Sequence, residues 1–418
     1  MARILWLSVV AVLLLFACEH LCEARTDPQT GRIRLLHIGL AFLRPDHPDP
    51  VYLSDPKLDL TMVPAFEWVM TEEEIRRSLR MYMPRSKEDL DRNFDLVMID
   101  GVDAAHIRTD FLEWVVDLVQ NGQLSFVMTD SGSGWGFAGS GTSWYITPVE
   151  RILTVDDQPG REGAVPSYAS NAFKLVPLDP THELMRNIPW DEIRFVAMNR
   201  PTERPGTRVV AQMSGERPVN REKPAIVYVD YPSGGRSVSY IFTWHTMVDS
   251  PIVLSLYRWK WHIDALLNFV YWPCKVAIPQ DLLLVHRVRE SMWDMDVTRG
   301  YVLSAMEFAD KIGANLQAID RKLSALDSKR RDCNGLYLRG EMEEAYRELS
   351  EVKAAYLDLV DEVLLARKKA LLWIFAVEWL VVTSTFVISG VALWSMMIRR
   401  RAYREVKATR IRREDGMW

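Results

Sequence analysis

The sequence has few cysteines and no excess of positive charge. Four cysteines occur among 418 residues, and Cys18 and Cys22 fall in an apolar N-terminal leader, so Cys274 and Cys333 are the pair expected in the mature chain. Two cysteines are too few for a disulfide framework or a cysteine zinc site. A formal net charge of −5 offers no cationic surplus for a nucleic-acid backbone. We therefore expect no nucleic-acid partner.

Phosphate loops and metal-ligand patterns are missing as well. The Gly-rich stretch 132–136 has no following lysine, and the histidines are scattered without metal-ligand spacing. No Asn-x-Ser/Thr acceptor for N-glycosylation occurs anywhere in the chain. We therefore expect neither a cofactor nor a metal, and an N-glycosylated surface is excluded.

Two apolar runs stand outside any globular pattern. The first, residues 4–17, follows a short start containing Arg3 and precedes a small-residue site ending at Ala24, which predicts a signal peptide over 1–24. An uncleaved N-terminal anchor is the alternative, and it places the following domain on the same side. The second run, 371–398, exceeds the roughly 20 apolar residues that cross a bilayer, which predicts a transmembrane helix.

The charges around the second run predict its orientation. Eight bases and three acids follow in the tail 399–418, whereas three bases, Arg367, Lys368 and Lys369, precede the run. Cytoplasmic flanks carry the excess of Lys and Arg. The sequence therefore predicts a single-pass protein of the cell membrane, with a cytoplasmic tail and a large extracytoplasmic domain, and the lipid bilayer is its first partner.

A helical stalk is expected over 286–370. Between 297 and 370 proline is absent, and apolar residues recur at alternating spacings of three and four on both sides of a Gly-containing segment around Gly335. This spacing is typical of a coiled-coil seam. We expect an antiparallel coiled-coil hairpin that turns near Gly335, is roughly 37 Å long, and pairs Ile319 with Leu349. The stalk serves either as a spacer or as a surface for self-association or another protein partner.

The remaining part, 25–285, has the pattern of an α/β domain. Apolar strands at 33–39, 94–100 and 124–129 alternate with helical stretches at 71–83 and 105–120, which indicates a parallel sheet with covering helices. Farther along, two strands at 225–229 and 236–242 flank a Pro-Ser-Gly-Gly turn, which predicts an antiparallel hairpin. A helix over 252–271 is expected to close the domain.

Several segments of this domain resemble a known family. The segments are Arg80-Met81-Tyr82-Met83-Pro84-Arg85-Ser86, Phe94-Asp95-Leu96-Val97-Met98-Ile99-Asp100, Gly134-Trp135-Gly136-Phe137 and 144–153, together with Gly234-Gly235-Arg236 and the helix that carries Trp259, Trp261, Asn268 and Trp272. They are similar to the glutamine amidotransferase-like family of the class I amidotransferase-like fold. The resemblance covers about 33–272 and implies that fold, but it does not by itself imply an activity.

A working amidotransferase needs a cysteine nucleophile on a sharp strand-to-helix turn, with a histidine base and an acid. The turn after 124–129 contains Asp130, Ser131 and Ser133 but no cysteine. His245 follows a strand as the fold's catalytic histidine does, yet Met247 stands where the family's acid is usual. We therefore expect no glutamine hydrolysis.

Two alternatives to a non-catalytic domain remain open. Ser131 or Ser133 with His245 and Asp249 forms a candidate serine triad. Asp100, Gly101, Asp103 and Asp130 are candidate ligand-binding residues, because ligands of open α/β sheets bind outside the carboxyl ends of the strands. The main expectation is a membrane-anchored pseudoenzyme that acts in recognition or assembly; the alternatives are a serine-dependent hydrolase and a receptor for a small ligand.

Overall fold

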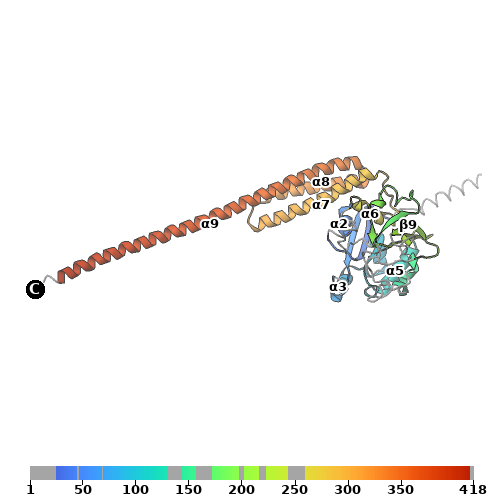
Figure 1. Cartoon of the computed structure of the whole chain (residues 1–418), viewed down its shortest axis with the longest axis horizontal. Coiled ribbons are helices and arrows are strands. Elements are labelled where there is room, and N and C mark those ends of the chain that lie inside the picture. The colour runs from blue at the N-terminus through green and yellow to red at the C-terminus, as the bar shows by residue number, and fades with distance from the viewer. Residues whose placement is uncertain are drawn as a thin grey trace, which may run out of the picture. The chain divides into compact units, whose positions relative to one another are not determined.

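A computed structural model describes residues 25–44, 47–67, 69–129, 144–156, 172–196, 202–215, 223–242 and 259–414 (Figure 1). The predicted signal peptide lies outside these residues. The chain divides into two compact units, Met1–Asp294 with Cys333–Leu349, and Met295–Asp332 with Ser350–Trp418.

The first unit contains, within its described residues, a mixed sheet of nine strands in the order β2-β1-β3-β4-β11-β10-β9-β6-β7. Its first half is parallel and comprises β2 (Leu58–Pro64), β1 (Ile33–Gly39), β3 (Leu96–Asp100), β4 (Ser125–Thr129) and β11 (Arg236–Tyr240). Strands β3 and β4 are buried at every position, as expected of parallel strands covered on both faces. The predicted α/β class and its parallel strands are confirmed.

The second half of the sheet is antiparallel. It comprises β10 (Lys223–Asp230), β9 (Arg208–Gly215), β6 (Ala172–Pro177) and β7 (Phe195–Val196). Strands β10 and β11 form the hairpin that the sequence predicts. A separate antiparallel pair joins β5 (Val155–Asp156) to β8 (Thr202–Glu203).

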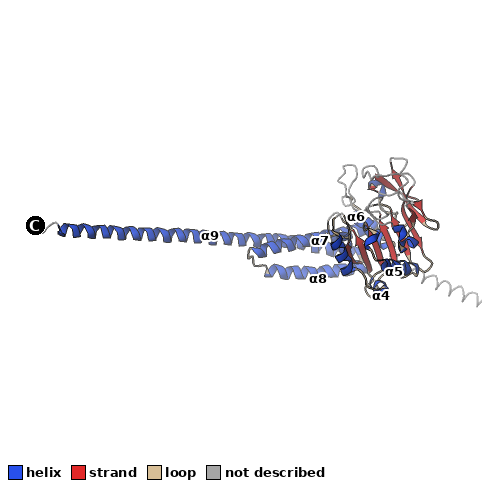
Figure 2. Cartoon of the chain, turned by 90° about the horizontal axis from the view of Figure 1, so that it is seen from below, coloured by secondary structure: helices blue, strands red, loops and turns tan. Residues whose placement is uncertain are grey.

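Helices accompany this sheet (Figure 2). They are α2 (Asp49–Ser54), α3 (Glu72–Tyr82), α4 (Lys87–Asn93), α5 (Thr109–Gln120) and α6 (His262–Tyr271), with short 3-10 turns η2 (Ala104–His106), η3 (Trp144–Ile146), η4 (Pro148–Ile152) and η6 (Trp190–Glu192). The C-terminal end of α6 is bonded to the sheet: Ser125 Oγ donates to the Pro273 carbonyl at 2.9 Å and Tyr240 Oη donates to the Phe269 carbonyl at 2.9 Å.

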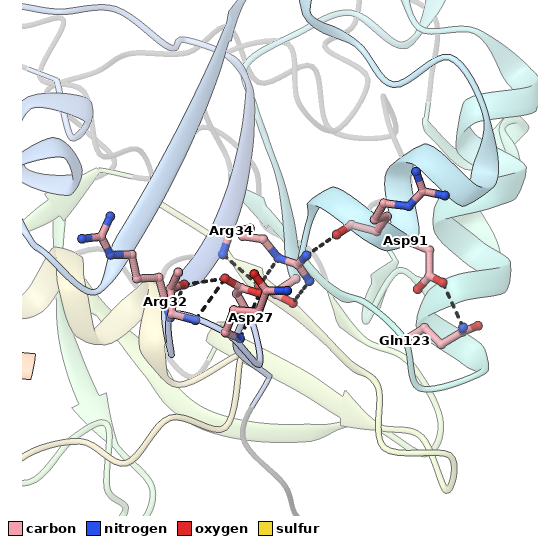
Figure 3. Close-up of polar contacts among 9 residues, drawn as sticks. Asp27, Arg32, Arg34, Asp91 and Gln123 are labelled. Atoms are coloured by element: carbon pink, nitrogen blue, oxygen red, sulfur yellow. Dashed lines mark hydrogen bonds and ion pairs between the residues drawn. The ribbon is translucent and has the colours of Figure 1, made fainter.

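Polar contacts fix the amino ends of β1 and β3 (Figure 3). Arg34 donates from Nε and Nη2 to the two carboxylate oxygens of Asp95, at 2.9 and 2.7 Å, and its backbone N–H donates to the same carboxylate at 2.9 Å. Nearby, Gln123 donates to Asp91 at 3.3 Å. This bidentate ion pair joins neighbouring strands, so it fixes their register at the amino ends of the strands. The predicted ligand site lies at the opposite, carboxyl ends.

The second unit is built from parts of three helices, α7 (Leu282–Lys311), α8 (Gln317–Arg339) and α9 (Met342–Glu414). Arg299 contacts Asp327 at 2.7 Å and Arg330 contacts Asp296 at 2.8 Å, which makes α7 and α8 antiparallel. Between α8 and α9, Tyr356 Oη donates to Asp327 at 2.6 Å and Lys322 contacts Glu362 at 2.5 Å. These pairs make α8 and α9 antiparallel too.

The apolar side chains predicted to form the seam are buried or half-buried, as expected, but the predicted position of the turn is wrong. Gly335 lies inside α8, and the chain reverses instead around Gly313 and Gly340, whose φ angles are 76° and 82°. A left-handed φ costs glycine little, so these glycines end their helices. The stretch expected as one helix is therefore two helices, α7 and α8. Supercoiling of the helices stays a prediction.

Helix α9 continues past its packed part without a break. Its seam side chains are buried as far as Val363, and Arg367 lies over the Phe308 ring of α7 at 4.4 Å. Farther on, large apolar side chains such as Trp379 and Phe386 are exposed. Within the part of the chain that the structure describes, α9 is the one helix long enough and apolar enough to cross a membrane.

Candidate functional site at the carboxyl ends of the strands

Four buried polar side chains meet where the parallel strands end. His37 lies near the end of β1, Asp100 is the last residue of β3, Thr129 is the last residue of β4, and Asp49 is the first residue of α2. The strand register sets Gly39, Asp100 and Thr129 side by side, and His37 opposite Met98 two residues earlier. Because side chains alternate along a strand, His37, Asp100 and Thr129 share one face of the sheet.

A glycine makes this meeting possible. Gly39 has a φ of 116°, and a Cβ placed there would lie 1.9 Å from the carbonyl oxygen of Asp100. The absence of a side chain lets the end of β1 approach β3, and the Leu40 N–H donates to that same carbonyl at 2.8 Å. The close approach of the two strand ends brings His37 within reach of Asp100.

The geometry of the cluster is that of a histidine between two acids. The Nδ1–H of His37 donates to Asp49 Oδ1 at 2.7 Å, and its Nε2 lies 3.6 Å from Asp100 Oδ2. The second oxygen of Asp49 accepts the backbone N–H of Phe42 at 3.0 Å, and Asp100 accepts a hydrogen bond from the Thr129 hydroxyl. His37, Asp49, Asp100 and Thr129 are fully buried.

Electrostatics keep this histidine charged. Burial by itself would lower the pKa of His37, but the negative charges of Asp49 and Asp100 and the hydrogen bond to Asp49 outweigh burial and raise the pKa to about 10. His37 is therefore an imidazolium at neutral pH. A cation of this kind cannot accept a proton from a nucleophile, so His37 is no general base. Its evident role is to compensate two buried carboxylates.

The residues predicted from the sequence fall into two groups. Asp100 lies in the His37 cluster. Gly101 adopts a φ of 70° in the turn after β3, and Asp103 caps η2, with its carboxylate accepting the Ala105 N–H at 2.8 Å. Asp130, Ser131, Ser133, His245 and Asp249 lie outside the described residues, so the serine triad and the ligand role of Asp130 stay predictions.

His37 and Asp49 are absent from the sequence predictions. His37 is counted there among scattered histidines, although it interrupts a strand that is otherwise apolar over Leu35, Leu36 and Ile38. A polar residue in such a strand needs a buried partner. Asp49 follows Pro48 at the start of a short helix. The sequence therefore shows that His37 needs a buried polar partner, but it does not identify Asp49 as that partner.

A second buried cluster lies elsewhere in the first unit. Arg289 of α7 is fully buried; its Nη1 donates to Asp264 of α6 at 2.9 Å, and its Nε donates to the Tyr337 hydroxyl at 3.3 Å. Asp55 accepts the hydroxyls of Tyr271 and Tyr337, at 2.6 and 3.0 Å. Burial raises the pKa of Tyr271 well above its ordinary value. These contacts join elements far apart in sequence, which is the signature of a structural cluster.

Metal and thiol chemistry find little support in the described residues. Among these residues no group of three or more His, Cys, Asp or Glu side chains is arranged to hold a metal ion. Cys274 and Cys333 are both buried, and burial raises the pKa of the Cys274 thiol well above its ordinary range. A thiol that stays protonated is a poor nucleophile.

Comparison with known proteins adds no assignment. The chain matches no family model and no curated protein.

Proposed function

We propose that the protein is a single-pass membrane-anchored recognition module whose extracytoplasmic domain, 25–285, has a class I amidotransferase-like fold without amidotransferase activity. The observation that carries the proposal is the continuity of α9. Its first part packs its apolar face against α8, and the same helix then runs as an exposed apolar segment over 371–398. An exposed apolar helical segment of this length is stable in lipid but not in water.

The lack of catalysis follows from the nucleophile. The sequence of the turn after β4 contains no cysteine, and both cysteines of the described chain are buried. His37, the histidine at the strand ends, is held as a cation by Asp49 and Asp100. These groups therefore offer charge compensation and folding stability, and neither a thiolate nor a neutral histidine base.

A protein partner or a second copy of the chain is proposed to bind the stalk. Exposed apolar side chains lie on the helices of the second unit: Tyr301 and Phe308 on α7, and Leu357 and Leu365 on α9. Scattered exposed apolar residues are common, but a contiguous apolar patch marks an interaction surface, and we infer that these four side chains contribute to one. This surface supports assembly in the membrane as the biological role.

Protease protection tests the topology. One epitope tag is placed before Asp27 and another after Trp418 in the full-length protein. Protease added to intact spheroplasts should remove the first tag and spare the second, because the bases that follow the apolar segment resist translocation. Protection of the first tag with loss of the second would show that the topology is inverted.

Assembly is tested on the same membranes. Mild detergent extraction followed by crosslinking and mass spectrometry should give a stoichiometric partner or a homo-oligomer through 286–370. Substituting exposed apolar positions, Tyr301→Gln with Leu357→Gln, should weaken that assembly, whereas Arg287→Gln, an exposed position of α7 in the first unit, should not. A monomer without partners before and after extraction would refute the assembly role.

A further inference from the structure

A basic groove lies beside α3 in the first unit. It has a volume of about 720 Å³ and is lined by Arg76, Leu79, Arg80, Met83, Pro84, Arg85, His106, Ile107 and Arg108. These residues come from α3 and the segment after it, and from the end of η2 and the two residues that link η2 to α5. Only residues 101–103 separate the carboxyl end of β3 from the start of η2, and ligands of α/β folds bind near such strand ends.

Four guanidinium groups surround this groove, although the chain as a whole carries a net charge of −5. Arg76 pairs with Glu72 at 2.5 Å and Arg108 with Asp110 at 3.3 Å, but both pairs are exposed to solvent and so bind weakly. Within the described residues, the guanidinium groups of Arg80 and Arg85 have no acidic partner. The local excess of positive charge remains available to an anion.

Part of the groove is fixed before any ligand binds. The Arg108 guanidinium lies over the Trp114 ring at 5.3 Å and donates to the Pro84 carbonyl at 3.4 Å. Helix α3 is anchored at its start by a capping box between Thr71 and Glu74. Because these contacts limit motion of both walls, binding loses less conformational entropy there.

The rest of the lining is apolar. Pro84 and Ile107 are buried, and Leu79 and Met83 are half-buried, so they form an apolar floor beneath the exposed arginines. A neutral apolar ligand would leave the guanidinium groups unpaired, and a bare inorganic ion would leave the floor uncovered. Guanidinium forks match the oxygens of phosphate and carboxylate groups. The lining therefore fits a molecule with both an oxyanion and an apolar body.

We propose that this groove binds a small organic oxyanion, with a phosphate or carboxylate group held by Arg80 and Arg85 and an apolar body lying on Met83 and Ile107. This inference goes beyond the proposed function, since binding of an oxyanion to the groove can be measured whatever the membrane topology or the partner of the stalk. The oxyanion can belong to a soluble metabolite or to an anionic lipid headgroup, and the two sources share this chemistry.

The test uses the full-length protein in phosphatidylcholine nanodiscs, with phenyl phosphate as the probe in isothermal titration calorimetry. Wild type should bind phenyl phosphate saturably and bind inorganic phosphate more weakly. The Arg80→Gln/Arg85→Gln variant should lose about tenfold or more in affinity, as expected when charged hydrogen bonds are removed. Met83→Gln should weaken phenyl phosphate more than inorganic phosphate.

Arg77→Gln is the matched control, since Arg77 is an exposed arginine of the same helix that does not line the groove. It should leave the affinity unchanged. Absence of saturable binding to wild type, or equal loss in Arg77→Gln and the double variant, would overturn the proposal. Competition by phosphatidylglycerol vesicles would assign the headgroup as the source of the oxyanion, and its absence would assign a soluble ligand.

Discussion

Removing the charge of Asp49 tests the buried His37 cluster. In the folded chain the pKa of His37 is raised from 6.5 to about 10. Since each tenfold difference in proton affinity corresponds to about 1.4 kcal/mol, this difference links protonation to at most about 5 kcal/mol of stability. Asp49→Asn keeps the size of the side chain and one acceptor oxygen, and we expect it to lower stability by about 3 kcal/mol at mildly acidic pH.

The effect should depend on pH in one direction. The folded chain binds the His37 proton more tightly than the unfolded chain does, so the stabilisation is complete below pH 6.5 and is lost as pH rises toward about 10. The stability difference between wild type and Asp49→Asn should therefore be largest near pH 6.5 and should shrink near pH 10. With His37 neutral, Asp49 loses the cation that compensates its charge.

Thermal unfolding followed by tryptophan fluorescence, with the full-length protein in detergent, measures this difference. A loss of about 3 kcal/mol should lower Tm by about 6–12 °C in a domain of this size. Glu73→Gln, which removes an exposed acid of α3, controls for net charge and should leave Tm nearly unchanged. A Tm difference that stays constant or grows from the acidic to the alkaline end would refute the argument that Asp49 holds an imidazolium.

Two further predictions concern the helices. Arg289→Met should destabilise the first unit by about 3 kcal/mol, because Asp264 loses its guanidinium partner and stays buried with the His286 ring at 2.6 Å. Arg287→Met, at an exposed position of the same helix, should have little effect, and Tm measurements compare the two variants. A short bismaleimide should crosslink Lys322→Cys to Glu362→Cys within one chain, since these two side chains are in contact in the structure. It should not crosslink Ile319→Cys to Leu349→Cys. Crosslinking of the second pair alone would refute the register of α8 against α9.

Burial decides which strands could be predicted from the sequence. Strand β1 has the predicted bounds, and β3, β4 and the β10–β11 hairpin lie within one or two residues of theirs, because continuous apolar runs and a Gly-Gly turn mark them. Strand β2 lies at the edge of the sheet and mixes exposed with buried positions, so its composition lacks that signal. Long-range pairing, not local composition, makes it a strand.

The stalk shows a different limit. Spacings of three and four identify the buried face correctly, from Val302 to Val363, because they reflect which side chains face inward. They do not show where the chain reverses, since Ile312 and Leu316 keep the rhythm across the break at Gly313. Gly335 and Gly340 are equivalent by residue type. Gly340 ends α8 in a left-handed conformation, whereas Gly335 remains helical.

The candidate site shows why residue type alone is a weak guide to function. Asp100 is a candidate because it ends a parallel strand, and the structure gives it a buried cationic neighbour, His37, that no spacing rule pairs with it. The His37 cation compensates the negative charges of Asp49 and Asp100, so the charges of this buried cluster neutralise one another. In the groove, the guanidinium groups of Arg80 and Arg85 have no acidic partner among the described residues, although the Arg85 backbone N–H donates to Asp89 at 3.3 Å, and both side chains are exposed to solvent. Binding free energy for an anion comes from charges that the fold has not already neutralised, so the proposed anion site belongs to the groove, whereas the buried histidine contributes to stability.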